Sequence, residues 1–108
     1  MPARSPNIHF STLLTPLEIE AVEAEARERN ATLSEVVDDA VTALLSDPGW
    51  RETGLTVPPL ASQKVIQRGY RLTPATLSLL DEAKREHGFE YRHVIRAALA
   101  PLVRKRRL

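Results

Sequence analysis

The chain has 108 residues, enough for one small domain or for two half-domains that share one core. It has no cysteine and no apolar run of membrane-spanning length, which excludes disulfide bridges, thiolate metal sites and membrane spans. Residues 1–54 carry ten acidic and four basic side chains, whereas residues 55–108 carry four acidic and eleven basic ones. This asymmetry predicts a polyanion or an acidic partner for the second half. The polar N-terminus predicts no signal peptide, and we expect a cytoplasmic protein.

The chain repeats itself at an offset of 58 residues without a gap. The aligned positions include Thr15-Pro16 with Thr73-Pro74, Arg27-Glu28 with Arg85-Glu86, Ala40 with Ala98 and Leu44 with Leu102. A register kept over this length indicates a real duplication. We therefore expect one domain over residues 1–108, made of two repeats (7–46 and 64–103), a linker (47–63) and a basic tail (104–108).

Each repeat opens with a run of period two, which predicts a strand. One face carries Ile8, Phe10, Thr12 and Leu14 in the first strand, and Ile66, Arg68, Tyr70 and Leu72 in the second. The other face carries Asn7, His9, Ser11 and Leu13, then Gln67, Gly69 and Arg71. Arg68 stands at an inward position, so either its side chain reaches out at the edge or a bulge at Gly69 shifts the register.

Thr-Pro follows each strand and predicts a helix start, with threonine as the N-cap and proline at the first helical position. In the first repeat, Thr15 and Glu18 form a predicted capping box. Asn30 and Gly88 are residue types that end helices in the left-handed conformation. The inward positions of these two helices are Ile19, Val22 and Ala26, then Leu77, Leu80 and Ala83.

A second helix follows in each repeat, with aliphatic pairs every four residues. Thr32 and Glu35 form another predicted capping box. Pro101 removes a backbone donor, which predicts a kink or an end at Ala100. The linker has no helical or strand period, and its Trp50 is either a stacking residue for a ligand or, as we favour, an apolar plug against the helices.

One repeat cannot bury its own apolar stripe, and a lone strand leaves both edges unpaired. Antiparallel pairing of the two strands over four converging helices solves both problems. The expected fold is mostly α with one two-stranded antiparallel β-ribbon, in the order strand-helix-helix, linker, strand-helix-helix, with pseudo-twofold symmetry.

A strand ending in Leu-Thr-Pro, a helix ending at Asn or Gly, and a second helix with paired aliphatics resemble the ribbon-helix-helix DNA-binding family. This chain resembles two such units fused in tandem, as in some single-chain members tied to plasmid transfer. The resemblance implies insertion of the ribbon into the major groove of double-stranded DNA. The implied base-reading residues are His9, Ser11, Leu13, Gln67, Gly69 and Arg71. In the family's register, Ser11 pairs with Gly69, His9 with Arg71 and Leu13 with Gln67.

The side chains of this face differ in what they can read. Arg71 suits guanine and Gln67 suits adenine, whereas His9 and Ser11 are weaker readers. Leu13 can meet a thymine methyl, and Gly69 either lets the backbone approach the groove closely or marks a bulge.

The resemblance also implies phosphate binding at the N-termini of the second helices. The residues at these positions are Thr32, Leu33 and Ser34 in the first repeat, and Tyr91 and Arg92 in the second. The basic tail adds Arg104, Lys105 and Arg106, which either bind phosphates, as they attract any polyanion, or form a solvated, frayed end. The second repeat is therefore expected to supply most of the charge and most of the specific contacts.

Catalysis has little support, because the chain has no glycine-rich phosphate loop and its three histidines fall at no metal-binding spacing. We expect no enzyme activity, no cofactor and no metal. A DNA-binding role fits a transcriptional regulator or an accessory protein of plasmid conjugation. The alternative is a protein-interaction module, antitoxin-like or adaptor, that uses the acidic helices of the first repeat. Further copies of the chain on adjacent DNA sites, and strand exchange between two chains, remain open.

Overall fold

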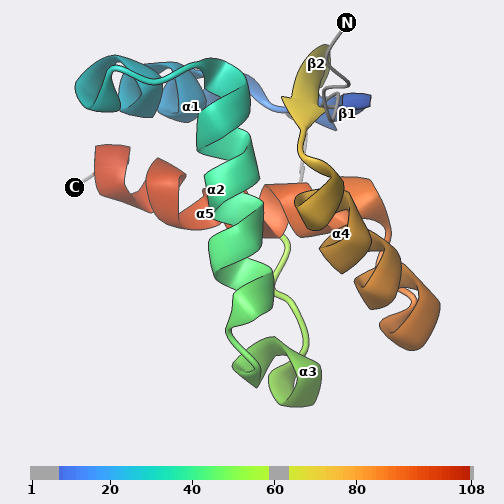
Figure 1. Cartoon of the computed structure of the whole chain (residues 1–108). Coiled ribbons are helices and arrows are strands. Elements are labelled where there is room, and N and C mark those ends of the chain that lie inside the picture. The colour runs from blue at the N-terminus through green and yellow to red at the C-terminus, as the bar shows by residue number, and fades with distance from the viewer. Residues whose placement is uncertain (1–7, 59–63, 108) are drawn as a thin grey trace, which may run out of the picture.

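The computed structural model describes residues 8–58 and 64–107; Asn7, the linker residues 59–63 and the tail residue Leu108 lie outside it. Within these ranges the fold is mostly helical, with one two-stranded antiparallel ribbon, as expected from the sequence (Figure 1). The elements in order are β1 (Ile8–Leu14), α1 (Pro16–Arg29), α2 (Leu33–Ser46), α3 (Gly49–Thr53), β2 (Ile66–Leu72), α4 (Pro74–His87) and α5 (Tyr91–Arg107).

The ribbon has the register that the family resemblance implied. Ser11 pairs with Gly69 at its centre, and the ladder runs without interruption from Ile8–Leu72 to Leu14–Ile66. The alternative of a bulge at Gly69 is therefore wrong. Helices cover one face of the ribbon, and they bury the side chains of Leu14, Tyr70 and Leu72 on that face.

The predicted helix boundaries follow local capping chemistry. The Thr15 hydroxyl accepts a hydrogen bond from the Glu18 amide, and the Glu18 carboxylate accepts one from the Thr15 amide. Thr32 and Glu35 form the same reciprocal pair at the start of α2. Helix α1 ends at Asn30 with φ 54° and α4 ends at Gly88 with φ 75°, the left-handed conformation that asparagine and glycine tolerate best.

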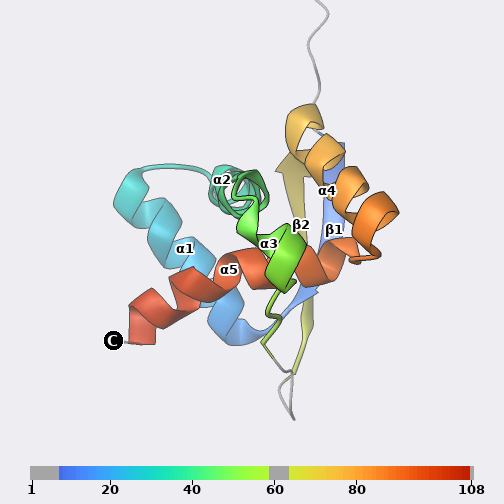
Figure 2. The same cartoon turned by 90° about the horizontal axis from the view of Figure 1, so that it is seen from below.

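Helices α2 and α5 cross at the centre of the fold, with α1 and α4 on opposite sides of the crossing (Figures 1 and 2). Helix α1 packs against α5 and α2, and α4 packs against α2 and α5. The sequence correctly placed Ile19, Val22, Ala26, Leu80 and Ala83 in the core, while Leu77 is half-buried at its edge. The rest of the buried centre comes mainly from the two crossing helices: Val36, Val37, Val41, Leu45, Val94, Ile95, Ala98 and Leu99.

The linker differs from its prediction because it contains the short helix α3. Trp50, in this helix, is only 5% exposed and donates from Nε1 to the Leu45 carbonyl at 3.1 Å. Its ring meets those of His87 and Phe89 edge-on, with centroids 4.9 and 5.9 Å away. The interpretation of Trp50 as an apolar plug is confirmed: it fastens the linker to the ends of α2 and α4.

Helix α5 also differs from its prediction, since it continues through Pro101 to Arg107. An end at Ala100 is therefore wrong, and most of the predicted basic tail is helical. Proline removes one backbone donor, but packing of the preceding buried turns against α1 and α2 holds the helix together.

Candidate nucleic-acid interface

All six predicted base-reading residues lie on the outer face of the ribbon and are exposed: His9, Ser11, Leu13, Gln67, Gly69 and Arg71. This follows from the strand period of two, because the inner face is fixed by Leu14, Tyr70 and Leu72. The structure thus brings these residues together on one accessible surface, which we call the reading face.

At the centre of the reading face, the imidazole of His9 leans across the ribbon onto Gly69. A β-carbon on Gly69 would lie 2.3 Å from Nε2 of His9, closer than any real contact. Gly69 is required here neither for a bulge nor for a positive φ, since the ladder is continuous and its φ is not in the left-handed region. The glycine leaves room for His9, its diagonal neighbour on the other strand. The register placed His9 diagonal to Gly69, but the contact between them was not predicted from the sequence.

Arg68 resolves its conflict with the inward pattern by reaching outward. Its side chain is exposed, and its guanidinium donates to the Gln67 carbonyl at 3.2 Å. Its cross-strand partner Thr12 is 4% exposed, and the Thr12 hydroxyl has no hydrogen-bond partner among the described residues. Arg68 therefore adds a positive charge at the rim of the reading face. Of the two alternatives that the sequence left open for Arg68, the outward-reaching side chain is the one observed.

The N-terminus of α2 flanks the β2 edge of the ribbon. The Ser34 hydroxyl accepts a hydrogen bond from the Arg71 amide at 2.8 Å and so ties the helix start to the strand. Thr32 donates its own amide to Glu35 at 2.8 Å and cannot offer it to a phosphate. The amides of Leu33 and Ser34 have no partner in the described part of the chain, so these two remain as donors at this flank.

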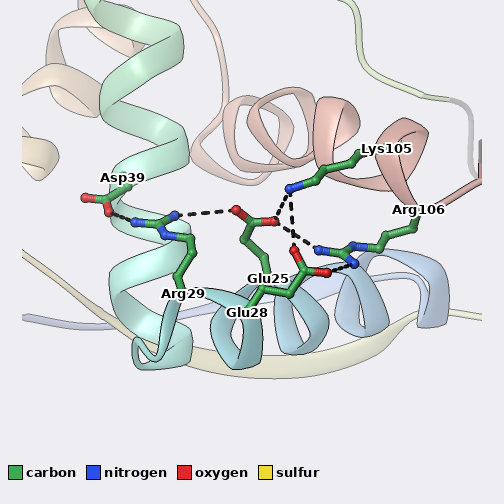
Figure 3. Close-up of polar contacts among 6 residues, drawn as sticks. All are labelled: Glu25, Glu28, Arg29, Asp39, Lys105 and Arg106. Atoms are coloured by element: carbon green, nitrogen blue, oxygen red, sulfur yellow. Dashed lines mark hydrogen bonds and ion pairs between the residues drawn. The ribbon is translucent and has the colours of Figure 1, made fainter.

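Acidic groups surround the α2 flank. A hollow of about 420 Å³ beside Arg71 is lined by Glu35, Asp38 and Asp39 among others. Asp38 is already used, because it accepts from the Thr73 amide at 2.7 Å and from the Thr76 hydroxyl at 2.8 Å. Asp39 pairs with Arg29 (Figure 3). The residual negative charge makes this flank the weaker candidate for phosphate.

The N-terminus of α5 flanks the opposite, β1 edge. The rings of Tyr91 and Phe10 lie 5.5 Å apart, and the ammonium group of Lys84 lies 5.5 Å from the centre of the Tyr91 ring. Lys84 is also 3.8 Å from the Glu90 carboxylate, which offsets the acid next to this flank. Arg92 is exposed beside it. The α5 flank is therefore the more favourable one for phosphate.

The predicted phosphate-binding tail lies elsewhere. The C-terminal end of α5 lies beside α1, about 25 Å of helix away from Tyr91 (Figures 1 and 2). Lys105 lies 3.0 Å from Glu25 and 3.6 Å from Glu28, and Arg106 pairs with the same two carboxylates (Figure 3). Arg104 is exposed at the same end. The structure does not bring Arg104, Lys105 and Arg106 to the reading face.

These ion pairs shift the ionisation of the groups involved. The hydrogen bond from Arg106 is the largest influence on Glu28 and lowers the pKa of its carboxyl from 4.5 to about 2. The hydrogen bond from Lys105 lowers the pKa of Glu25 below its ordinary value. Part of the charge asymmetry between the two halves is therefore neutralised inside the molecule, where acidic α1 meets basic α5.

The described ranges were also compared with the requirements of a metal site and of a membrane-spanning helix. No group of three or more histidine and acidic side chains there is arranged to hold a metal ion. No helix in those ranges has the length and apolar character to cross a membrane. No family model matches the sequence, and comparison with curated proteins and with solved structures finds no match.

Proposed function

We propose that the chain is a tandem ribbon-helix-helix protein that binds double-stranded DNA by inserting its ribbon into the major groove. In this proposal β1, α1 and α2 form one unit and β2, α4 and α5 the other, related by a pseudo-twofold axis through the Ser11–Gly69 pair. A two-stranded ribbon fits the width of the major groove, and exposed polar side chains on its outer face can contact base edges.

One observation carries the proposal: both helix N-termini are joined to the edges of the same exposed ribbon. Helix α2 reaches the β2 edge through the Ser34–Arg71 hydrogen bond, and α5 reaches the β1 edge through the Phe10–Tyr91 contact. Free amides and positive dipole ends at these positions suit the two phosphate backbones that border the groove. A ribbon without such flanks would have contacts to bases but no anchors to position it.

The test is an anisotropy titration of random duplexes with wild type, Arg71→Ala and Arg85→Ala at several salt concentrations. Arg85 is an exposed arginine near the C-terminal end of α4, so its replacement removes the same charge outside the six residues of the reading face. We expect wild-type binding that weakens steeply with salt, and a larger loss for Arg71→Ala than for Arg85→Ala. Absence of wild-type binding at low salt would overturn the proposal.

The same reading face would serve a transcriptional regulator or an accessory protein in plasmid conjugation. Genome-wide binding sites in a host would distinguish promoters from a transfer origin. Additional copies on adjacent sites would appear in the same experiments as more than one chain per duplex.

The alternative, a protein-interaction module on the acidic first repeat, has a smaller basis than the sequence suggested. Glu18 is paired with Arg96, and Glu25 and Glu28 are paired with the end of α5. On α1, Glu20 and Glu23 remain. They line a groove of about 270 Å³ together with apolar side chains and with Arg27 and the paired Arg106. A basic, partly apolar peptide is the partner that this groove suits. If wild type ignores DNA, Glu20→Gln and Glu23→Gln are the variants that test this alternative.

A further inference from the structure

We infer that the DNA target is directional, with guanine at the Arg71 end of the ribbon and an A·T pair at the Leu13–Gln67 end. This inference rests on the proposed function and deepens it, because it assigns a base preference and an orientation to the reading face. Its basis is the register of the two strands and the position of His9.

The reading face has different chemistry at its two ends. The Arg71 end pairs a guanidinium with His9, whereas the opposite end pairs Leu13 with Gln67. Arg71 lies four residue steps after Gln67, which is about 13 Å along β2. This length matches roughly four base-pair steps, so the two ends contact different base pairs of one short site.

At the first end, Arg71 is held ready for a base contact. Its amide donates to the Ser34 hydroxyl, which fixes the backbone while the side chain stays exposed. A guanidinium donates two parallel hydrogen bonds to O6 and N7 of guanine, and no other base presents two acceptors at this spacing. A guanine preference at this end follows.

At the second end, both side chains favour an A·T pair. Leu13 is 40% exposed although it is apolar, and its methyl groups can contact only the C5-methyl of thymine favourably. The amide of Gln67 on the paired strand offers one donor and one acceptor, the pattern that N7 and N6 of adenine require. Leu13 therefore prefers thymine and Gln67 prefers adenine. One A·T base pair, or two neighbouring ones, can provide both bases.

The centre is read from β1 alone. Gly69 presents no side chain, and the imidazole of His9 occupies the space above it beside Ser11. The 58-residue offset relates Arg71 to Leu13, Gln67 to His9 and Gly69 to Ser11. The two side chains of each related pair differ in chemistry. The two halves of a palindromic site have the same bases, so equivalent bases would meet unlike side chains. The chain consequently has one preferred orientation on its site.

The experiment first selects the site from random duplexes with the full chain, then fixes the orientation of the protein on it. The chain has no cysteine, so Ala75→Cys, exposed and just beyond the Arg71 end of β2, carries a single tethered DNA-cleaving reagent. We expect a non-palindromic site with cleavage on its guanine side only. Arg71→Ala should reduce discrimination at the guanine end, and Gln67→Ala at the A·T end, each by roughly 5- to 150-fold without affecting the other end.

A charge-neutral exchange is the decisive control. The double variant Leu13→Arg with Arg71→Leu keeps the composition but moves the guanidinium to the other end. In the Ala75→Cys background, the exchange variant should still prefer guanine, now through the arginine at position 13. The protein should therefore bind the site in the opposite orientation, and cleavage should move to the A·T side. A palindromic site, cleavage on both sides of the wild-type site, or unchanged cleavage in the exchange variant would overturn the inference and leave the proposed function intact. Failure of the wild type to bind any duplex would overturn both.

Discussion

Arg96 of α5 and Glu18 of α1 form an ion pair inside the fold, with side chains 7% and 4% exposed. Nε of Arg96 donates to both carboxylate oxygens at 3.1 and 2.9 Å, and the guanidinium also donates to the Pro58 carbonyl at 2.7 Å. The same carboxylate caps the start of α1 through the Thr15 amide. One buried pair thus ties together the first repeat, the second repeat and the linker.

The equivalent positions on the other side of the fold use different chemistry. At the 58-residue offset, Glu18 corresponds to Thr76 and Arg96 corresponds to Asp38. Asp38 accepts a hydrogen bond from the Thr76 hydroxyl at 2.8 Å. If two first repeats paired, Glu18 would face Asp38, and if two second repeats paired, Arg96 would face Thr76. Both combinations bury an unsatisfied charge, so the two contacts favour pairing of unlike repeats.

We predict that Arg96→Asp destabilises the fold by about 3–5 kcal/mol, because it leaves Glu18 buried beside a second carboxylate. Glu18→Thr in the same chain should recover much of this loss, since the double variant reproduces the contact between Asp38 and Thr76 at the equivalent site. Urea unfolding of wild type, both single variants and the double variant gives the coupling free energy. Additive effects of the two substitutions would show that the pair does not act as a unit.

The features that the sequence predicted correctly are those set by local chemistry. The reciprocal capping of Thr15 by Glu18, the left-handed ends at Asn30 and Gly88, and the alternating faces of the strands each depend on residues within four positions of one another. The ribbon register was expected only from the resemblance to the ribbon-helix-helix family, which implied pairing of Ser11 with Gly69.

The features that the sequence missed depend on contacts between distant segments. The partners of Glu18 and Asp38 lie 78 and 38 residues away, and no periodicity connects them. The docking of Lys105 on α1 depends on how α5 crosses the fold, so the sequence alone predicted a phosphate-binding tail instead. Helix α3 is too short for a periodic signal, and it forms where Trp50 is packed against α2 and α4.

Gly69→Ala should weaken DNA binding by displacing His9 from the centre of the reading face. The added β-carbon would collide with the imidazole at Nε2, while the backbone conformation itself tolerates alanine. We therefore expect a loss of several-fold in affinity in wild type and almost none in a His9→Ala background, where the space is already empty. Anisotropy titrations of the four proteins on one selected duplex check this, and an equal loss in both backgrounds would contradict the steric explanation.

Trp50→Ala should destabilise the protein by about 3–5 kcal/mol, because it removes a large buried ring and leaves a cavity at the ends of α2 and α4. Trp50→Phe keeps the aromatic contacts with His87 and Phe89 but loses the hydrogen bond to Leu45, which should cost about 1–2 kcal/mol. Denaturant midpoints give both values. Glu52→Ala, at an exposed position of the same helix, is the matched control, and a loss as large as that of Trp50→Ala would argue against the plug.

The ion pairs between α1 and the end of α5 should make stability depend on pH in the acid range. The pKa of Glu28 is lowered to about 2 in the folded chain and is 4.5 without its partners, so its contribution is complete above pH 4.5 and disappears as the pH falls toward 2. Glu25 acts in the same direction because its pKa is also lowered. The free energy of unfolding should therefore decrease through this window.

Glu28→Gln removes this contribution and gives the measurement. The difference in urea midpoint between wild type and Glu28→Gln should be largest above pH 4.5, shrink as the pH approaches 2, and also shrink in high salt, because the carboxylate is exposed. Glu20→Gln makes the same charge change on α1 at an acid without an ion pair in the described ranges. A pH-independent difference for Glu28→Gln, or an equal one for Glu20→Gln, would show that the end of α5 is not held on α1 by these carboxylates and is free to reach another polyanion.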